Sequence, residues 1–279
     1  MCEISVVMPV YNSAVYVTHA IESVLMQSFG DFELIIVDDG STDNTIALIG
    51  ACSDKRIKLL HNKHDFISSL NRGMNAARGK YIARMDADDL MHVDRLKIQR
   101  SIMNEHPEIT VCGTWATIFG DASQEKNLMG TAKGMIDLPL LNLLPGNFIF
   151  HPTAMLRADF YKQQGLQYEH YPYAEDYKLW VEIAKLGGKF YVESQPLLYY
   201  RVSDSQVSTV HKTEQGKTTE RIKAEVMTYL IEKNAVGYPE LTDIHAAFCK
   251  LKDKGLITEN EASTFLQLIF LKNREKLSI

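Results

Sequence analysis

Short, almost wholly apolar segments recur along the first hundred residues, and helical patterns separate them. Apolar segments of this length are typical of strands that are buried on both faces of a sheet. Their alternation with helices requires right-handed crossovers and predicts an α/β fold with a mostly parallel sheet flanked by helices. The predicted strands are 4–9, 32–38, 57–60 and 81–85, and the predicted helices are 15–27, 45–51, 69–77 and 94–104.

The alternation loosens after residue 105, and residues 120–146 look irregular because Gly and Pro interrupt them. Helical patterns dominate from about residue 212, where Thr258-x-x-Glu261 has the form of a capping box. Further strands are predicted over 111–119, 153–156 and 197–201, and further helices over 176–186, 217–234, 240–254 and 259–272.

Composition and charge exclude several classes of protein. The 46% of hydrophobic residues excludes a disordered chain, and the net charge of −5 argues against a nucleic-acid partner. The four cysteines form no C-x-x-C pair, so neither a zinc site nor a disulfide framework is predicted. Three features predict a cytoplasmic protein. The thiols are isolated, no basic stretch precedes an apolar run at the N-terminus, and no apolar run reaches ~18 residues.

Acidic side chains stand where the predicted strands end, which is the edge at which ligands bind in α/β sheets. The tetrad Asp86-Ala87-Asp88-Asp89 directly follows the fourth strand. Three neighbouring carboxylates repel one another unless a cation or hydrogen-bond donors offset their charge. A hard divalent cation that bridges these carboxylates and a diphosphate would do so. The alternative is a polar turn in which Asp89 caps the next helix.

The second predicted strand ends in the sequence DDGSTD, which begins at Asp38. Ser41 or Asp43 can cap the following helix, and this needs no further function. Capping does not account for Asp38 and Asp39, because a pair of buried acids is costly. A carboxylate at this position can accept a hydrogen bond from a nucleobase or from a ribose hydroxyl.

The first predicted strand ends at Pro9, which lacks an N–H and therefore fits only where a strand finishes. Tyr11 follows it and can either stack on a base or pack against the protein. No G-x-G-x-x-G follows this strand, which disfavours a dinucleotide-dependent oxidoreductase. A phosphatase of the haloacid-dehalogenase type would carry its D-x-D after the first strand rather than after the fourth.

A second acidic site begins the helix predicted over 176–186. Acids in a first helical turn interact favourably with the helix dipole, so Glu175 and Asp176 can be purely structural. Asp176 is also a candidate general base. His151 precedes Pro152 and is interpreted either as a loop residue or as a contact for an acceptor.

Taken together, these segments resemble family 2 glycosyltransferases of the GT-A fold. The matching segments are SVVMPVYN, FELIIVDDGSTDNT, GKYIARMDADD, YPYAEDYKLW and YYRVSDSQVS, in the family's order over about residues 4–208. Within the family they are most similar to bacterial lipooligosaccharide and O-antigen enzymes that form β-1,3 linkages. The resemblance implies a GT-A domain over 1–208, with a nucleotide-binding half over about 1–105 and an acceptor half over 106–208, before a helical segment over 209–279.

The resemblance also assigns roles to individual residues. Asp88 is implied as the ligand of Mn²⁺ or Mg²⁺, and Asp176 as the base that deprotonates the acceptor hydroxyl with inversion at the anomeric carbon. Glu175 and His151 are expected on the acceptor side. The residues implied to bind a UDP-sugar donor are Pro9, Tyr11, Asp39, Arg84, Asp86 and Asp88.

The implied acceptor is a glycan of the bacterial surface, usually lipid-linked, so we expect the enzyme to work at the inner face of the cytoplasmic membrane. The C-terminal helices could then contact that membrane, form a homodimer or simply pack. A sugar nucleotidyltransferase is an alternative, but it would need a Gly-rich loop with Arg and Lys after the first strand. A catalytically inactive sugar-nucleotide-binding homologue is another, and the intact acids argue against it.

Two segments depart from the family pattern. Relatives often have a His after Tyr-Arg where this chain has Ser203, and His211 is a candidate to replace it. Relatives also often carry Asn-x-Gly before Ser-Leu-Asn, whereas residues 64–71 are shorter and lack this Gly. The donor contacts of that loop therefore cannot be transferred from the family.

Overall fold

The computed structural model describes residues 2–120, 126–128, 132–202 and 211–279. The chain divides into two compact units, here called the sheet unit and the helical unit. The sheet unit comprises Met1–Ile136, Ile149–His170 and Gly188–Gln206. The helical unit comprises Asp137–Phe148, Tyr171–Gly187 and Val207–Ile279.

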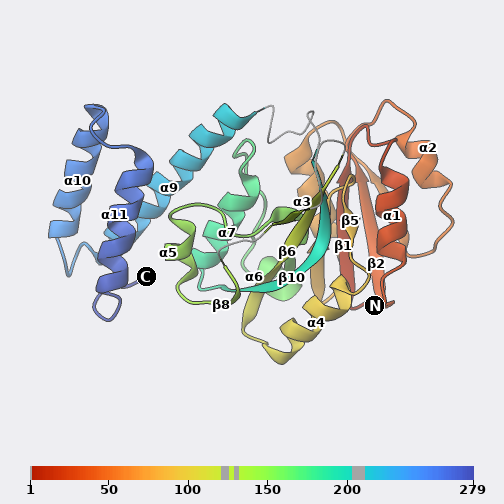
Figure 1. Ribbon diagram of the computed structural model, residues 1–279, viewed down its shortest axis with the longest axis horizontal. Coiled ribbons are helices and arrows are strands. Elements are labelled where there is room, and N and C mark those ends of the chain that lie inside the picture. Colours follow the sequence, from red (N-terminus) through yellow and green to blue (C-terminus); the bar gives the residue numbers. More distant parts are fainter. Residues whose placement is uncertain (1, 121–125, 129–131, 203–210) are drawn as a thin grey trace. The chain divides into compact units, whose positions relative to one another are not determined.

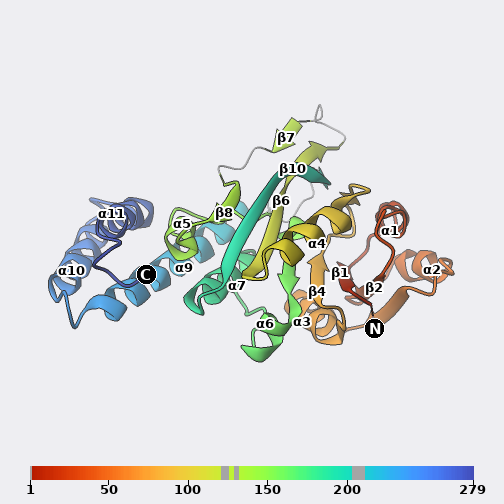
Figure 2. The same ribbon diagram turned by 90° about the horizontal axis from the view of Figure 1, so that it is seen from below.

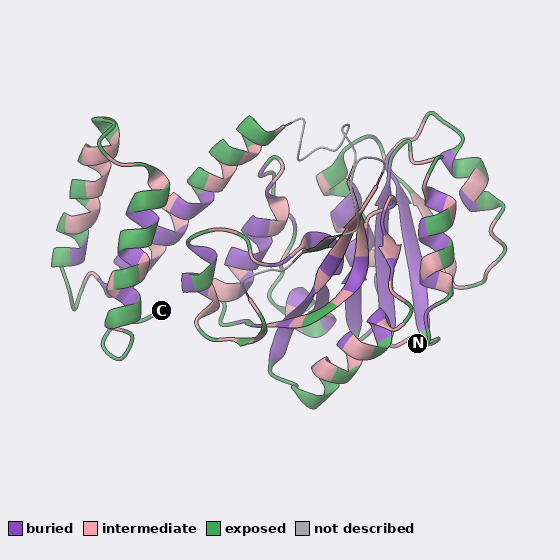
Figure 3. Cartoon of the chain, in the orientation of Figure 1, coloured by how far each residue is buried: buried purple, intermediate pink, exposed green. Residues whose placement is uncertain are grey.

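Four parallel strands form the first part of the sheet, in the order β3-β2-β1-β4. They are β1 (Ile4–Val10), β2 (Phe32–Asp38), β3 (Ile57–His61) and β4 (Tyr81–Arg84). β1, β2 and β4 are buried along their whole length, as Figure 3 shows. This burial accounts for their almost uninterrupted apolar sequences.

The sheet is mixed beyond β4. β9 (Met155–Arg157) runs antiparallel to both β4 and β6 (Ile109–Phe119), and β10 (Lys189–Arg201) runs parallel to β6. The short strands β5 (Leu90–Met91), β7 (Lys126–Leu128) and β8 (Gly134–Ile136) pair antiparallel. The predicted α/β fold is confirmed, but its parallel part is smaller than expected, because β5, β7, β8 and β9 all pair antiparallel.

Helices cover both faces of the parallel strands. Figure 2 shows α1 (Val17–Leu25), α2 (Thr45–Gly50) and α4 (Arg95–Glu105) on one face, and α3 (Phe66–Ala76) on the other. The shared core of the first face includes Ile21, Val24 and Leu96, which pack against side chains of β1 and β2. The sequence did not predict α6 (Ala158–Gln163), β5 or the first half of β10.

The helical unit contains α5 (Pro139–Leu143), α7 (Glu175–Lys185), α9 (Lys212–Asn234), α10 (Glu240–Asp253) and α11 (Glu259–Lys272), seen in Figure 1. Its core includes Trp180, Leu230 and Phe270. The capping box at Thr258 and Glu261 is confirmed, since each side chain accepts the other residue's backbone N–H. Among the described helices, none combines the length and hydropathy that a membrane crossing requires.

The turn between α3 and β4 leaves no room for a side chain at Gly79. A Cβ there would lie 2.6 Å from the backbone N of Ser5 and 2.8 Å from the backbone C of Ile4. Because backbone atoms of β1 cannot yield as side chains do, Gly79→Ala should lower the free energy of unfolding by about 1–3 kcal/mol. Urea denaturation measures this change.

Gly216→Ala is the matched control, because Gly216 lies inside α9 and a Cβ there meets nothing within 4 Å. It should raise the free energy of unfolding by about 0.5–1 kcal/mol through better helix propensity. Equal stabilities of the two variants would contradict the packing described at Gly79.

Candidate functional site

The carboxyl ends of β1 and β2 lie side by side because Val10 pairs with Asp38. The next residue, Asp39, donates its backbone N–H to the Val10 carbonyl at 2.8 Å. Its buried carboxylate accepts hydrogen bonds at Oδ1 from the Asp65 N–H at 2.8 Å and the Ser69 hydroxyl at 2.6 Å. Asp39 therefore ties the end of β2 to the first turn of α3.

Asp38 is satisfied by the turn that follows it. Its oxygens accept the backbone N–H groups of Gly40 at 3.3 Å and Ser41 at 3.2 Å. Gly40 adopts a φ of +82°, which favours glycine. Asp43 accepts the N–H of Thr45 at 3.0 Å, but the N-cap residue of α2 is Asn44, so the predicted capping by Ser41 or Asp43 is wrong. The buried pair of acids thus has donors from the chain itself, which sequence reasoning did not foresee.

Asn12 is a site residue that sequence reasoning missed. Its φ is +45°, and its Oδ1 accepts the Thr42 N–H at 2.8 Å. Its own N–H donates to the Ser41 hydroxyl at 3.0 Å. These bonds join the loop after β1 to the loop after β2. Asparagine tolerates this backbone region, but its identity alone does not reveal such a conformation.

Tyr11 is exposed, with 44% of its surface accessible. Its ring stacks on that of His64, with centroids 4.1 Å apart and planes inclined by 29°. His64 Nδ1 lies 3.3 Å from Oδ2 of Asp39. Pro9 is buried in β1, paired with Val37. The structure therefore brings Tyr11 and Asp39 together through His64, which the sequence did not single out for a role.

The tetrad after β4 forms a compact acidic cluster. Asp86, Asp88 and Asp89 each offer a carboxylate oxygen within 4.8 Å of the others. Asp89 Oδ1 accepts the Arg201 N–H at 2.9 Å, and its buried Oδ2 has no hydrogen-bond partner among the described residues. Asp89 does not cap α4, whose N-cap residue is Asp94, so the capping alternative is wrong.

Burial and mutual repulsion shape the electrostatics of this acidic cluster. Burial, with a contribution from Asp86, raises the pKa of Asp88 to about 6. Burial and both neighbouring acids raise the pKa of Asp89 well above its usual range. Buried Arg84 forms an ion pair with Asp86. Burial alone would lower the pKa of Arg84, but the negative charge of Asp86 outweighs this effect, so the pKa of Arg84 is raised. Burial and repulsion therefore oppose the ionisation of Asp88 and Asp89.

The geometry of the acidic cluster fits one divalent cation with oxygen ligands. Oxygens bound to Mg²⁺ or Mn²⁺ at about 2.0–2.2 Å can lie no more than about 4.4 Å apart, so small side-chain adjustments would suffice. The orphaned Oδ2 of Asp89 and the repulsion between Asp86 and Asp88 both favour added positive charge. In the part of the chain that the structure describes, these three acids form the cluster that could hold a metal.

Arg201, the last residue of β10, borders the acidic cluster. Its guanidinium carbon lies 4.3 Å from the ring centroids of both Tyr16 and Phe119. Its Nε donates to the backbone carbonyl of Asp88 at 2.8 Å. The Tyr-Arg motif could be identified in the sequence. Its position beside the acidic cluster follows only from the pairing of β10 with β6 and β5.

His151 is buried in the sheet unit, where its Nε2 lies 2.8 Å from the Tyr168 hydroxyl. Burial, with a contribution from Arg84, lowers the pKa of His151 well below its usual value, so the ring is neutral at physiological pH. The backbone of Tyr168 is held in turn by the Asn71 side chain, at 2.9 and 2.8 Å. His151 is therefore a fixed, neutral group rather than a mobile loop residue.

Asp176 and Glu175 begin α7 and belong to the helical unit, whereas the predicted donor-binding residues belong to the sheet unit. Asp176 Oδ2 accepts a hydrogen bond from Asn147 Nδ2 at 2.8 Å, and Oδ1 accepts the Tyr177 N–H at 2.7 Å. Both oxygens are therefore oriented by donors within their own unit. Asn147 is a further residue that the sequence did not predict.

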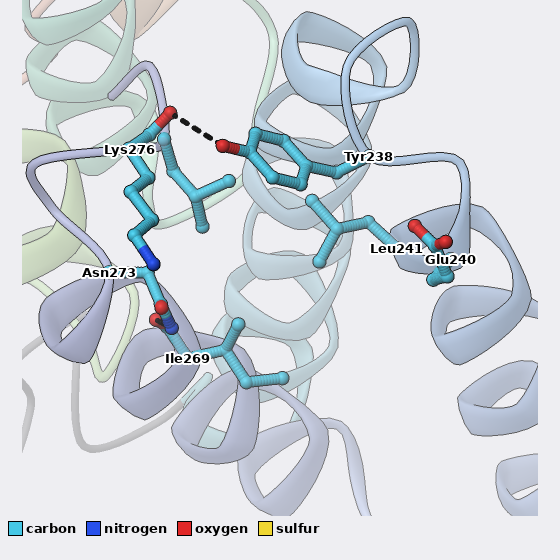
Figure 4. A pocket seen from close by; sticks show the side chains of 7 residues that line it. Tyr238, Glu240, Leu241, Ile269, Asn273 and Lys276 are labelled. Carbon is cyan, nitrogen blue, oxygen red and sulfur yellow. Dashed lines mark hydrogen bonds between the residues drawn. The ribbon is translucent and has the colours of Figure 1, made fainter.

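Two other features belong to the helical unit. His211 stacks on Tyr173, with ring centroids 4.3 Å apart, and its Nδ1 lies 2.7 Å from the Glu214 carboxylate. Ser203, which stands where relatives often have a His, lies outside the described residues. A hollow of about 180 Å³ lies beside α10 and α11, and Figure 4 shows the side chains that line it. The labelled lining residues are Tyr238, Glu240, Leu241, Ile269, Asn273 and Lys276, and none was predicted as a site residue.

Comparison with known proteins gives one family. Residues 5–165 match the family model described as glycosyl transferase family 2. The chain is 36% identical over 256 residues to an uncharacterized glycosyltransferase of Haemophilus influenzae, covering 86% of this chain and 78% of that protein. It also matches longer Rickettsia glycosyltransferases, of whose length it spans less than a third.

Two solved structures share the fold. S. aureus TarS 1–349 in complex with UDP-GlcNAc has a TM-score of 0.64 at 20% identity, covering 85% of this chain and 74% of that one. The mannosyltransferase PcManGT from Pyrobaculum calidifontis, in complex with GDP-Man and Mn²⁺, has a TM-score of 0.61 at 16% identity, covering 100% and 76%. These likenesses concern the fold alone, and they confirm the predicted GT-A type.

The raised pKa of Asp88 predicts a pH-dependent cost in stability. An unfolded Asp has a pKa of ~3.9, so between about pH 4 and 6 the folded chain holds more protons at Asp88 than the unfolded chain does. The contribution of Asp88 to stability therefore falls as the pH rises through this window. Asp88→Asn should be more stable than the wild type by about 0.5–2 kcal/mol at pH 8 in EDTA, and little different at pH 4.

Denaturant titrations at both pH values measure this difference. Asp137→Asn is the control, because 82% of the Asp137 side chain is exposed, and it should change little at either pH. A loss of stability in Asp88→Asn at pH 8 would show that the ionised carboxylate stabilises the fold instead.

Proposed function

We propose that this chain, which belongs to glycosyltransferase family 2, is an inverting enzyme that uses a UDP-sugar. It would transfer a hexose or N-acetylhexosamine to a sugar hydroxyl of a bacterial surface glycan, forming a β-1,3 linkage. The observation that carries this proposal is the position of Asp39 and of the acidic cluster at the carboxyl ends of β2 and β4, the parallel strands on either side of β1. Nucleotides bind at this edge in α/β sheets.

The base site would be formed by Tyr11 and Asp39. Asp39 Oδ1 already accepts hydrogen bonds from Asp65 and Ser69, which leaves Oδ2 to accept the N3–H of uracil. Tyr11 would stack on the base, and Pro9, the residue before the last one of β1, would lie beneath it. The two proteins of similar fold hold UDP-GlcNAc and GDP-Man. Both ligands are sugar nucleotides, but their bases differ. The choice of uridine rests on Asp39.

The acidic cluster would hold Mn²⁺ or Mg²⁺ against the diphosphate, with Asp88 as a ligand and Asp86 on the ribose side. Bound there, the cation would offset the charge of the departing UDP. Buried Arg84 would hold Asp86 in place through their ion pair. Arg201 lies beside Asp88 and adds a second fixed positive charge to this end of the sheet.

Asp176 would take the proton of the acceptor hydroxyl while the oxygen attacks the anomeric carbon. The bond between that carbon and the UDP oxygen breaks on the opposite face, so an α-linked donor gives a β-linked product. Asn147 and the Tyr177 N–H hold the Asp176 carboxylate in one orientation for this step. Glu175 and His151 would contact the acceptor, which we propose is lipid-linked.

Turnover of a panel of sugar nucleotides tests the proposal as a whole. We expect release of UDP from a UDP-hexose or UDP-N-acetylhexosamine when a β-linked product forms on an oligosaccharide acceptor. Release of GDP from GDP-mannose alone would reject the assignment of the base. An α-linked product, identified by NMR, would reject the inverting mechanism.

The hydrogen bond to uracil N3–H predicts a preference among pyrimidines. Cytosine has no N–H at this position, and an unpaired buried carboxylate costs ~1–3 kcal/mol, so UDP should bind about tenfold or more tightly than CDP. In Asp39→Asn, Oδ1 can still accept from Asp65 and Ser69, while Nδ2 can donate to cytosine N3. This variant should lose or reverse the preference; equal affinities of the wild type for UDP and CDP, measured by calorimetry, would refute the role of Asp39.

The role of Asp176 predicts a kinetic defect without a binding defect. Asn at this position keeps the shape of the side chain but cannot take a proton, so Asp176→Asn should lower the transfer rate by about 10²–10⁴. UDP affinity with Mn²⁺ should not change. Asp159→Asn is the control, because Asp159 also lies in a first helical turn and should cost at most about 1 kcal/mol of stability. Near-normal turnover in Asp176→Asn would remove it as the base.

A further inference from the structure

The loop between β3 and α3 places His64 against both residues of the proposed base site. The His64 ring stacks on Tyr11 with centroids 4.1 Å apart. Its Nδ1 lies 3.3 Å from Asp39 Oδ2 and 3.2 Å from the Asp39 carbonyl oxygen. Residues 64–71 are also where this chain departs from the family pattern, so His64 belongs to a segment that the proposed function does not explain.

These two contacts have the chemistry of a bound pyrimidine. A flat aromatic ring stacks on Tyr11, and a ring nitrogen that can carry a proton faces the carboxylate of Asp39. Asp39 Oδ1 is already occupied by Asp65 and Ser69, so Oδ2 is the oxygen that an incoming base would use. It is also the oxygen that His64 faces. A base and His64 therefore compete for the same acceptor.

The side chain of His64 can leave this position without disturbing the fold. It is 65% exposed. The backbone that follows it is held in place at Asp65. The Asp65 N–H is held by Asp39, and the Asp65 side chain caps α3 by accepting the Ser68 N–H at 3.0 Å. Rotation about the His64 side-chain bonds alone would therefore uncover Tyr11 and Asp39 Oδ2.

We propose that His64 is an intramolecular stand-in for the nucleobase, which the donor must displace in order to bind. This inference rests on the proposed function, in which Tyr11 and Asp39 receive uracil. His64 lowers the affinity for the donor, because only the fraction of molecules with His64 turned away can bind it. It also covers one face of the Tyr11 ring and the Asp39 carboxylate until a ring that can replace both contacts arrives.

Calorimetric titration of UDP into His64→Ala tests the proposal. If His64 holds the site for most of the time, its removal should tighten UDP binding by about three- to tenfold. His64→Phe keeps a ring for Tyr11 but has no nitrogen for Asp39, so it should give a smaller gain. His61→Ala is the matched control, because His61 is a neighbouring exposed histidine that faces Asp38 at 3.6 Å, and it should leave the affinity unchanged.

Each other outcome overturns the inference. Weaker UDP binding in His64→Ala would make His64 a contact for the base, and unchanged binding would show that it does not compete. If neither the wild type nor His64→Ala binds UDP, the proposed function fails, and this inference fails with it. NMR gives a second readout: the His64 ring protons should lose the shift caused by Tyr11 when UDP is added, and a shift that persists at saturation contradicts displacement.

Discussion

The register of β1 between β2 and β4 is the constraint on which the rest of the site depends. Ile4 pairs with Phe32 on one side and with Tyr81 on the other, and all three strands run in the same direction. Their carboxyl ends therefore share one edge, where Asp39 follows β2 and the acidic cluster follows β4. A shift by one residue would turn every side chain of β1 to the other, equally buried face and would separate the Ser5 hydroxyl from the Glu33 carboxylate, to which it donates at 2.7 Å. Core packing and this hydrogen bond therefore fix the edge together.

The same edge carries charge that the fold tolerates rather than requires. Asp38 and Asp39 receive hydrogen bonds from the chain, whereas Asp88 and Asp89 keep raised pKa values because burial and mutual repulsion oppose their ionisation. Burial even lowers the pKa of Arg95, which lies beneath the acidic cluster, to about 9. A stable scaffold thus holds a strained group of acids, as is common where a protein binds a cationic ligand.

The sequence predicted the buried strands well because their apolar segments directly record burial on both faces. It also located the strand-end acids, since a strand's end is readable wherever polar residues interrupt an apolar segment. It did not predict Asn12, His64, Asn147 or Arg201, because their roles depend on a positive φ, on ring stacking or on contacts across 29 to 113 residues. Strands were predicted at β6, at β9 and in the last part of β10, but the antiparallel pairing of β9 was not, because pairing depends on contacts between distant segments.

We propose that the acids at this edge bind a nucleotide together with a divalent cation. Calorimetric titration of UDP, first in EDTA and then with excess Mn²⁺, tests it most directly. Mn²⁺ should tighten UDP binding to the wild type by about tenfold or more, roughly 1.4 kcal/mol, and Asp88→Ala should lose this gain. Equal UDP affinities of the wild type with and without Mn²⁺ would contradict it.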